Sequence, residues 1–428
     1  MQKKAAFKTL GCRLNQMETD ALVTDFTKAG YEVVPFGDKA DVYIVNTCTV
    51  TNQSDQKSKN TINKAVRHGN ENGVVVVTGC MATSQKEALE KRDDLTFVVE
   101  NKQKKSVLKI VESYYKGETI QPEDIKADLF NFTVVEKGFH TRSMIKVQDG
   151  CNNHCTFCIV PKVRGRGNSR PYTEIEDNIK KVLQLGYKEI VLTGVNISRY
   201  HYNNQRFEDI VEKILEIPGD FRVRISSIEP EGFTDKFIEL FYHPKMSPHL
   251  HMCLQSGSPS VLKRMRRFYS LEEYIALIER FRTIDPLFNF TTDIIVGFPG
   301  ETEQEFEESL EIIKQLKFSH IHTFKYSVRK GTLAETLPNH VNEKLKTERS
   351  EVVRKLVEEL KLDYRSQFIG KEQILLTESK VVDGLRRGYS EYYVPLAIDE
   401  LKVEQNQFYK VKLQEIMHGS EPVLRADI

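Results

Sequence analysis

The sequence lacks long apolar runs. No stretch of its 428 residues approaches the ~20 apolar residues that a membrane-spanning helix requires. The first residues, Met1–Phe7, carry two lysines and no apolar signal core, so a secretory signal is not indicated. These absences predict a cytoplasmic protein with no membrane partner.

An excess of charge of one sign is lacking too. The chain has 62 Lys and Arg against 61 Asp and Glu, a formal net charge of +1, which argues neither for nor against a nucleic-acid partner. Tryptophan is absent, and nothing follows from that absence. A hydrophobic fraction of 39% is enough for packed cores, and the chain length favours two or three domains.

Cysteine is scarce, with seven residues in the whole chain. In a reducing compartment, so few cysteines are not expected to form a disulfide framework. Metal binding or redox chemistry is the better expectation for them.

Residues 1–115 alternate short apolar β-branched runs with helical patterns, which predicts a doubly wound, flavodoxin-like parallel sheet. Residues 116–140 are polar and irregular and are interpreted as a linker. The strands are expected at 4–10, 31–36, 41–47, 74–78 and 96–100, and the helices at 15–29, 54–68 and 84–91.

The strand–helix alternation restarts after the linker and extends over residues 141–368. It gives about six βα units, too few for a closed eight-stranded barrel, so the prediction is a partial (βα)6 barrel with reactive groups at the carboxyl ends of its strands. A charge-laced stretch at 342–366 is expected to be a solvated helix. The strands are expected at 144–148, 189–192, 222–228, 249–254, 289–296 and 320–327, and helices at 173–185, 207–215, 271–282 and 302–316.

Residues 369–428 show period-two patterns, which predict a small all-β, OB-like barrel. The expected strands are 373–377, 389–396, 408–413 and 422–428.

Three cysteines, Cys151, Cys155 and Cys158, form a C-x3-C-x2-C motif on one short predicted loop. Three thiolates can hold three corners of a cubane iron–sulfur cluster and leave the fourth iron open for a ligand that is not protein. The alternative is a structural zinc site with His154 as the fourth ligand. Zinc motifs usually pair two short ligand spacings far apart, and no second pair is obvious, so the cluster is favoured.

Three other cysteines, Cys12, Cys48 and Cys80, stand at the ends of three predicted parallel strands. In the flavodoxin-like order, strands one, three and four are neighbours, so these thiols are expected at one edge and could hold a second cluster with an open iron. Each could instead be a buried small apolar residue, but the shared edge favours the cluster. Cys253, within its predicted strand, is expected to be a core residue.

C-x3-C-x2-C at the end of a first barrel strand resembles the radical S-adenosylmethionine (SAM) superfamily, and Phe157 matches its aromatic residue before the last cysteine. Together with the three-cysteine α/β domain and a C-terminal β module of TRAM type, the chain resembles the methylthiotransferases. The segment Gly-Cys-Arg-Leu-Asn-Gln at 11–16 is similar to the MtaB-type subgroup, whereas the MiaB type reads Gly-Cys-Gln-Met-Asn and the RimO type Gly-Cys-Pro-Lys-Asn.

The resemblance implies two 4Fe-4S clusters and SAM as cofactors. The cluster on Cys151, Cys155 and Cys158 would cleave SAM to a radical, and the cluster on Cys12, Cys48 and Cys80 would hold the inserted sulfur. Since the cofactors carry the chemistry, no catalytic side chain is assigned. Residues at other strand ends would contact SAM: Thr193, Gly194, Ser227, Glu229, Gln255 and Gly297. For each of these a turn or a helix cap is the plain alternative.

The resemblance further implies methylthio insertion at carbon 2 of N6-threonylcarbamoyladenosine beside the anticodon of a tRNA, with a sulfur source and an electron donor such as flavodoxin or ferredoxin. The alternatives are an isopentenyladenosine tRNA or a ribosomal protein as substrate, or, in another class, a zinc-stabilised RNA-binding protein without catalysis. Lys162–Arg166 and Lys263–Arg267 are candidate phosphate clamps or simply solvated charge. The C-terminal module counts 8 Lys and Arg against 10 Asp and Glu, so its charge does not indicate RNA binding.

Overall fold

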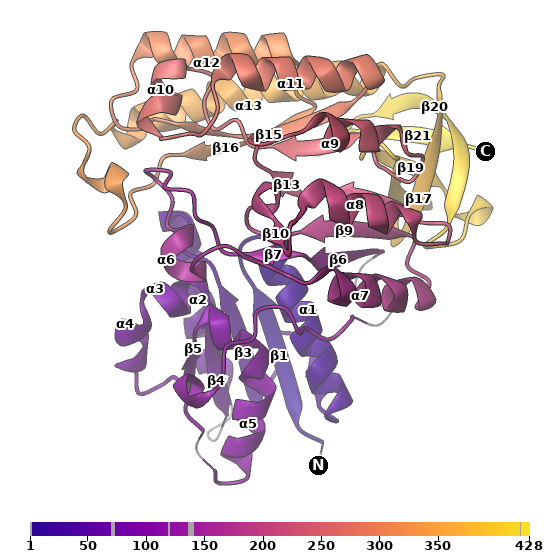
Figure 1. The fold of residues 1–428 in the computed structure, drawn as a ribbon. Coiled ribbons are helices and arrows are strands. Elements are labelled where there is room, and N and C mark those ends of the chain that lie inside the picture. The colour runs from indigo at the N-terminus through magenta and orange to yellow at the C-terminus, as the bar shows by residue number, and fades with distance from the viewer. Residues whose placement is uncertain (1, 70–72, 119, 136–140, 420) are drawn as a thin grey trace. The chain divides into compact units, whose positions relative to one another are not determined.

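The computed structural model describes residues 2–69, 73–118, 120–135, 141–419 and 421–428 (Figure 1). The chain divides into two units, each built from more than one segment. The first unit comprises 1–139, 146–170 and 327–332, and the second comprises 140–145, 171–326 and 333–428.

The first unit contains a five-stranded parallel sheet in the order β2-β1-β3-β4-β5. This is the flavodoxin-like order, so the predicted fold of this region is confirmed. The strands are β1 (Lys4–Thr9), β2 (Glu32–Val34), β3 (Val42–Thr47), β4 (Val74–Gly79) and β5 (Phe97–Val99).

Both faces of this sheet are buried because alternate residues of each strand enter different cores. Ile44 belongs to the core under α1 (Arg13–Lys28) and α5 (Val107–Tyr115). Val45 belongs to the opposite core, under α2 (Asn52–His68), α3 (Cys80–Ser84) and α4 (Lys86–Glu90). Continuous Val and Ile runs are typical of such doubly covered strands.

The segment 146–170 belongs to the first unit, although the sequence alternation groups it with the barrel. Its two-residue strands β7 (Gln148–Asp149) and β8 (Asn168–Ser169) pair antiparallel and bracket α6 (Val160–Arg164). Ile159 and Val163 pack on Cys80 in a small apolar cluster.

The segment 327–332 joins the first unit through Arg329, which pairs with Asp55 at 2.6 Å and donates to the carbonyl of Thr49 at 3.0 Å. The hydroxyl of Ser327 also accepts from the amide of Asn52 at 2.9 Å. The predicted linker, over its described residues, holds a single 3-10 turn, η2 (Pro122–Asp124). A further 3-10 helix, η1 (Asn101–Ser106), precedes α5.

The second unit contains strands in two sheets, ordered β12-β9-β6 and β13-β14-β15-β16. An isolated parallel bridge between Val223 and Met246 connects the two, and the strands follow chain order across both sheets, as a partial barrel requires. The strands are β6 (Arg142–Lys146), β9 (Glu189–Thr193), β12 (Arg222–Ile225), β13 (Ser227–Ile228), β14 (His249–Met252), β15 (Asn289–Val296) and β16 (His320–Lys325).

The helices between these strands begin at residues that the sequence marks clearly. Ser270 with Glu273 and Thr302 with Glu305 form capping boxes, which satisfy the first backbone amides of α11 and α12. The helices are α7 (Tyr172–Gln184), α8 (Phe207–Glu216), α9 (Asp235–Glu239), α10 (Pro259–Arg264), α11 (Leu271–Ile284) and α12 (Glu303–Leu316). A small hairpin, β10 (His201–Tyr202) with β11 (Gln205–Arg206), was not expected.

Helix α13 (Glu343–Ser366) corrects the prediction of a solvated helix, because one of its faces is buried. Arg349 on that face is 3% exposed and pairs with Glu301 at 2.7 Å. Lys346, also 3% exposed, donates to the carbonyl of Tyr326 at 3.1 Å. Burial of the charged heads is possible because each has a partner.

The C-terminal module is a closed five-stranded barrel in the order β17-β18-β19-β21-β20, which confirms the OB-like prediction. Asp383 and Gly384, both with positive φ, form the tight turn that joins its first two strands. The strands are β17 (Glu372–Val382), β18 (Leu385–Tyr389), β19 (Pro395–Asp399), β20 (Phe408–Met417) and β21 (Val423–Asp427).

Among the described residues, no helix combines the length and apolar character that crossing a membrane would need.

Candidate metal centres and the barrel edge

The cysteines at positions 12, 48 and 80 lie at one edge of the first unit's sheet. Each follows a strand directly or within three residues, and β1, β3 and β4 are parallel neighbours, so their carboxyl ends meet. Gly11 (φ +99°) lies so close to Cys48 that a Cβ there would be 2.8 Å from the Cβ of Cys48 and 3.0 Å from its Sγ. Only glycine therefore permits this approach of the first two cysteine segments.

The thiols of this set also affect one another. Burial raises the pKa of the Cys48 thiol, and the nearby Cys80 and Cys12 add to the increase. Cys48 and Cys80 are buried, whereas Cys12 is exposed. The site therefore has a closed side and an open side, which suits a metal cluster that must also meet a ligand.

The C-x3-C-x2-C loop is held by its own backbone. The amide of Cys151 donates to the carbonyl of Gly165 at 3.1 Å, and the amide of Cys158 donates to the carbonyl of Cys155 at 3.1 Å. Gly150 (φ +72°) passes so close to Arg166 that a Cβ would lie 2.1 Å from its carbonyl oxygen. The three cysteines and Phe157 are half-buried, so the thiols are fixed and accessible.

A single zinc ion requires ligand atoms that lie close together. With zinc–sulfur bonds of about 2.3 Å, two ligand atoms of one ion are at most about 4.6 Å apart. Among the described residues, the one group of three His, Cys, Asp or Glu ligand atoms all within 4.8 Å of one another is His251, Cys253 and Asp293. His154 is exposed. Three thiols without a fourth protein ligand are the donor set that an iron–sulfur cluster with one open iron requires.

The sequence did not predict that His251, Cys253 and Asp293 lie together in the second unit. His251 Nε2 lies 3.3 Å from a carboxylate oxygen of Asp293, and its Nδ1 lies 2.9 Å from the hydroxyl of Thr291. Cys253 is buried, as expected for a core residue. Its neighbours on the adjacent strand could not be known without the register of β14 on β15.

Five buried ionisable residues form what we call the buried charge cluster. It lies next to Cys12, Cys48 and Cys80, which we call the first cysteine set because they come first along the chain. Glu18 accepts from Lys104 at 2.5 Å and from Lys146 at 2.9 Å, and Arg164 reaches Glu18 at 3.0 Å and Asp149 at 3.1 Å. Burial raises the pKa of Glu18, but the three cations outweigh it and hold that pKa well below its usual range. The cluster joins α1 and η1 to both ends of the C-x3-C-x2-C segment.

Two asparagines hold the cysteine loops, and one of them also contacts this cluster. Asn15 donates to the carbonyls of Leu10 and Thr47, at 2.9 and 3.0 Å, and accepts from Arg164 at 2.6 Å. Asn101 donates to the Sγ of Cys80 at 3.6 Å and to the carbonyl of Val163 at 2.8 Å. Asn15 had a sequence signal, its place in the motif at 11–16, whereas Asn101 had none.

In the second unit the residues predicted to contact SAM lie at or just beyond the ends of parallel strands. Thr193 ends β9 and Gly194 follows it, and Ser227 lies in β13. Gln255 follows β14 in the left-handed region (φ +71°) and bridges to Ile294. Their shared edge agrees with the expectation, and their contacts with SAM stay predictions.

Two of the predicted positions have structural partners. The carboxylate of Glu229 pairs with Arg267, and burial raises the pKa of Glu229. The amide of Gly297 donates to Glu301 at 2.6 Å, and a Cβ at Gly297 would lie 2.4 Å from the Cγ of Lys346. The space beside Gly297 is therefore filled by a lysine stem.

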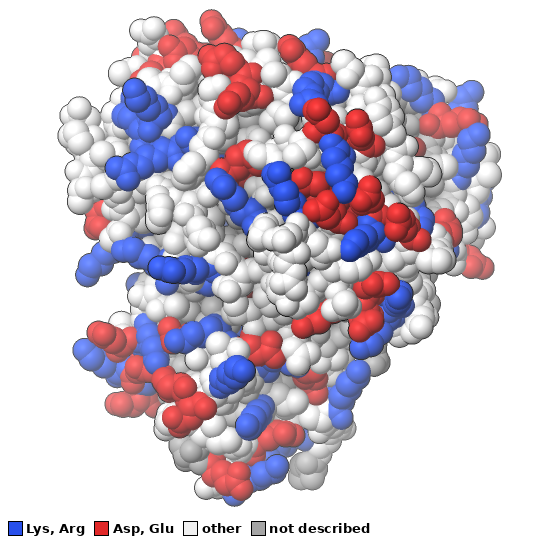
Figure 2. All heavy atoms as spheres, viewed as in Figure 1, with Lys and Arg blue, Asp and Glu red and all other residues white. Residues whose placement is uncertain are grey.

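The structure corrects the candidate phosphate clamp at 162–166, because Arg164 is buried in the charge cluster. In the second candidate, Arg264 makes a bidentate pair with Glu305, at 2.8 Å for both bonds, and Lys263 and Arg266 are exposed. Figure 2 shows Lys and Arg interspersed with Asp and Glu on the face in view. RNA contact is thus not marked by a single basic patch on that face.

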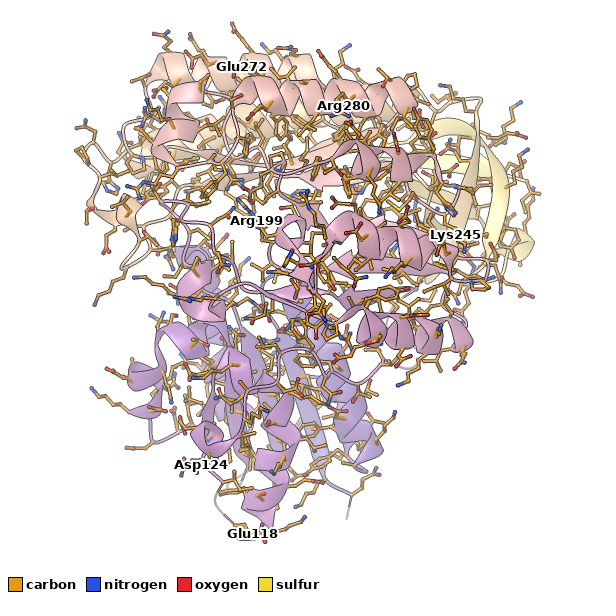
Figure 3. The ribbon with its side chains drawn as sticks, in the orientation of Figure 1. Glu118, Asp124, Arg199, Lys245, Glu272 and Arg280 are labelled. Atoms are coloured by element: carbon orange, nitrogen blue, oxygen red, sulfur yellow. The ribbon has the colours of Figure 1, made fainter. Side chains whose placement is uncertain are left out.

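One exposed aromatic residue near this segment has a cation beside it. Phe268 is 51% exposed, and the guanidinium of Arg199 lies 5.6 Å from its ring centroid. Arg199, labelled in Figure 3, is held by Glu231 at 2.6 Å. An exposed ring flanked by a fixed guanidinium is a suitable surface for stacking a nucleic-acid base.

Two protein-family models match parts of this chain. The radical SAM superfamily model matches residues 145–313, and the model of an uncharacterized protein family, UPF0004, matches residues 4–100. Among solved structures, the radical SAM methyltransferase TsrM from Kitasatospora setae has a TM-score of 0.58 at 13% identity, covering 78% of this chain and 74% of that one. That likeness concerns the fold alone.

Curated relatives match over the full length. The threonylcarbamoyladenosine tRNA methylthiotransferase MtaB of Thermotoga maritima is 36% identical over 100% of this chain and 98% of its own, and that of Bacillus subtilis is 37% identical over 95% and 93%. A tRNA-2-methylthio-N(6)-dimethylallyladenosine synthase of Fusobacterium nucleatum is 35% identical over 88% of each chain.

The fold and the C-x3-C-x2-C loop define a radical SAM protein with an additional three-cysteine α/β domain. The chain belongs to the radical SAM methylthiotransferase family, in its MtaB-type group.

Proposed function

We propose that this protein inserts a methylthio group at carbon 2 of N6-threonylcarbamoyladenosine in tRNA. The observation that carries the proposal is the presence of two separate three-cysteine sets in one unit, in a chain whose MtaB-named relatives match it from end to end. A radical initiator alone needs one such set, and a sulfur-inserting enzyme has use for two.

The residues fit two clusters with different surroundings. Cys151, Cys155 and Cys158 would hold one cluster on a half-buried loop and leave one iron free for the amine and carboxylate of SAM. When these groups are bound, they supply a radical able to remove hydrogen from an unactivated aromatic carbon, which no side-chain acid or base can do. Phe157, the residue before Cys158, would help to position SAM.

Cys12, Cys48 and Cys80 would hold the sulfur to be transferred. Cys48 and Cys80 are buried and Cys12 is exposed, so a cluster here would be open toward one side only. Asn101 donates to Cys80 and fixes that thiol relative to the neighbouring loop. A sulfur source and an electron donor such as flavodoxin or ferredoxin complete the proposed reaction in the cytoplasm.

The tRNA nucleoside is tested by mass spectrometry of tRNA from a strain that lacks the gene. We expect 2-methylthio-N6-threonylcarbamoyladenosine to disappear, and to return with the wild-type gene but not with Cys80→Ala. Persistence of this nucleoside in the deletion strain would rule out the proposed substrate. Loss of the isopentenyl counterpart instead would assign the protein to the other tRNA substrate.

The division of labour between the clusters is tested in the purified protein. After anaerobic reconstitution, about eight irons per chain would support two cubane clusters, and about four only one. Cys151→Ala should abolish SAM cleavage, whereas Cys80→Ala should retain cleavage and lose sulfur insertion. Equal loss of cleavage in both variants would contradict the assignment, as would a colourless protein that contains zinc and no iron.

A further inference from the structure

The buried charge cluster carries an unbalanced charge. It contains three cations and two carboxylates, and every one of these side chains is at most 4% exposed. A buried excess of positive charge is costly unless an anion compensates it. A further negative partner in the first unit would stabilise the cluster. Its members are Glu18, Lys104, Lys146, Asp149 and Arg164.

The first cysteine set lies within electrostatic reach of two of these cations. Negative charge at Cys80 and Cys12 acts to raise the pKa of Arg164, and negative charge at Cys80 acts to raise that of Lys104 against the opposing effect of burial. Geometry agrees, because Val163, the residue before Arg164, packs on Cys80. Asn15, three residues after Cys12, accepts a hydrogen bond from Arg164 at 2.6 Å. Thiolates on this set, together with the sulfides of a cluster that they hold, would supply the missing negative charge.

We propose that Lys104 and Arg164 are positioning residues that stabilise the negative charge of a cluster on Cys12, Cys48 and Cys80, and that Glu18 sets how much of their charge acts on it. The inference rests on the proposed function, which places a cluster at these cysteines. It gives the chain's own residues control over the reduction potential of the sulfur-donating centre.

The sign of the effect follows from Coulomb's law. Reduction adds one negative charge to the cluster, and a nearby buried cation stabilises that charge more than it stabilises the oxidised form. Removal of the Lys104 charge should therefore lower the reduction potential. Removal of the Glu18 charge leaves more of the positive charge of Lys104 and Arg164 to act on the cluster, and should therefore raise the reduction potential.

Both substitutions keep the packing close to the original. Glu18→Gln preserves the size of the side chain, and Lys104→Met replaces a buried stem with another of similar length. After Lys104→Met, Glu18 keeps Lys146 at 2.9 Å and Arg164 at 3.0 Å as partners. After Glu18→Gln, Lys146 and Arg164 keep Asp149 at 2.6 and 3.1 Å, and Lys104 keeps the side-chain oxygen of Asn15 at 3.4 Å.

The test uses the full chain with Cys151, Cys155 and Cys158 changed to Ala, so that one cluster remains. Iron is counted first, and about four irons per chain are expected. A redox titration followed by electron paramagnetic resonance then gives the potential. We expect Lys104→Met to lower it, Glu18→Gln to raise it, and the double variant to return close to the parent value.

Lys105→Met is the matched control. Lys105 pairs with Asp25 at 2.7 Å, and Asp25 lies roughly 20 Å along α1 from Cys12, against roughly 9 Å for Glu18. The reduction potential of the cluster should change least in Lys105→Met. Shifts of the same sign in Lys104→Met and Glu18→Gln, or no shift in either of these two, would overturn the inference. Absence of iron from the three-alanine parent would overturn the proposed function and the inference together.

Discussion

The side-chain amide of Asn101 donates a hydrogen bond to the Sγ of Cys80, at 3.6 Å, and a second to the carbonyl of Val163, at 2.8 Å. Asn101→Ala removes both. One net hydrogen bond is worth about 0.5–1.5 kcal/mol, so we expect a cluster at the first cysteine set to lose iron to a chelator about 2- to 13-fold faster.

The measurement is the rate of iron release from the chain that lacks the C-x3-C-x2-C cysteines. Asn60→Ala, on the exposed side of α2, is the control and should release iron at the parent rate. Equal rates for Asn101→Ala and its parent would mean that the amide does not support the cluster.

Glu189 in the second unit is surrounded by arginines from two strands. It pairs with Arg222 at 2.6 Å and with Arg142 and Arg224 at 2.9 Å each, and is 1% exposed. Glu189→Gln leaves Arg222 and Arg224 buried without their anion, whereas Arg142 keeps Glu378 at 2.6 Å, so the free energy of unfolding should fall by about 3–5 kcal/mol at pH 7. Urea denaturation measures this. Glu212→Gln, a half-exposed partner of Lys236, should cost about 0–1 kcal/mol.

The effect of Glu189 should also depend on pH. Burial raises its pKa, but the arginines outweigh burial and hold the folded-state pKa far below the unfolded value of about 4.3. The stabilisation is therefore complete above about pH 4.3 and decreases as the pH falls toward the folded-state pKa. The difference between wild type and Glu189→Gln should shrink at about pH 3.5. A constant difference from neutral to acid pH would contradict the charge explanation.

Phe268 with Arg199 offers a stacking surface for RNA. Phe268→Ala should weaken tRNA binding by about 1–3 kcal/mol, or about 5- to 150-fold, if one base stacks there. Fluorescence anisotropy at fixed salt measures the dissociation constant. Tyr242→Ala is the control, because Tyr242 is 68% exposed. Equal effects of the two substitutions would remove the special role of Phe268.

Gln255 occupies a backbone conformation (φ +71°) that costs a residue with a side chain about 1–2 kcal/mol. Gln255→Gly should relieve this strain and raise the free energy of unfolding by about 0.5–1 kcal/mol. If the side chain contacts SAM, the same variant should bind SAM more weakly. Asp383→Gly, at φ +52° in the C-terminal barrel, should leave SAM binding unchanged. Unchanged SAM affinity in Gln255→Gly would exclude a SAM contact from that side chain.

The sequence predicts the sheet edge that carries Cys12, Cys48 and Cys80. Local periodicity places the strand ends, and parallel neighbours bring those ends together. Cys48 follows β3 and Cys80 follows β4 without any side-chain detail being needed. The flavodoxin-like order was predictable for the same reason. In the C-terminal barrel the sequence predicted four strands, because 389–396 was interpreted as one strand, whereas β18 ends at Tyr389 and β19 begins at Pro395.

The buried charges were not predictable. Glu18, Lys104 and Arg164 each stand among polar residues of ordinary surface character, and their pairing spans up to 146 positions. Lys346 and Arg349 in α13 show the same limit, since a local charge pattern cannot reveal a tertiary partner. Ion pairs between distant segments depend on the whole fold, whereas strand ends depend on a few neighbours.

The first unit is assembled from segments separated along the chain, and this affects how the protein is made. Glu18 and Lys104 leave the ribosome before Lys146 and Arg164 exist, so the early sheet contains an incomplete ion network. At about 5–20 residues per second, the interval between residues 115 and 170 lasts about 3–11 s. During those seconds the nascent domain already contains Cys12, Cys48 and Cys80 but not its finished support. Loading of metal at these cysteines is therefore expected to follow synthesis of the C-x3-C-x2-C segment rather than precede it.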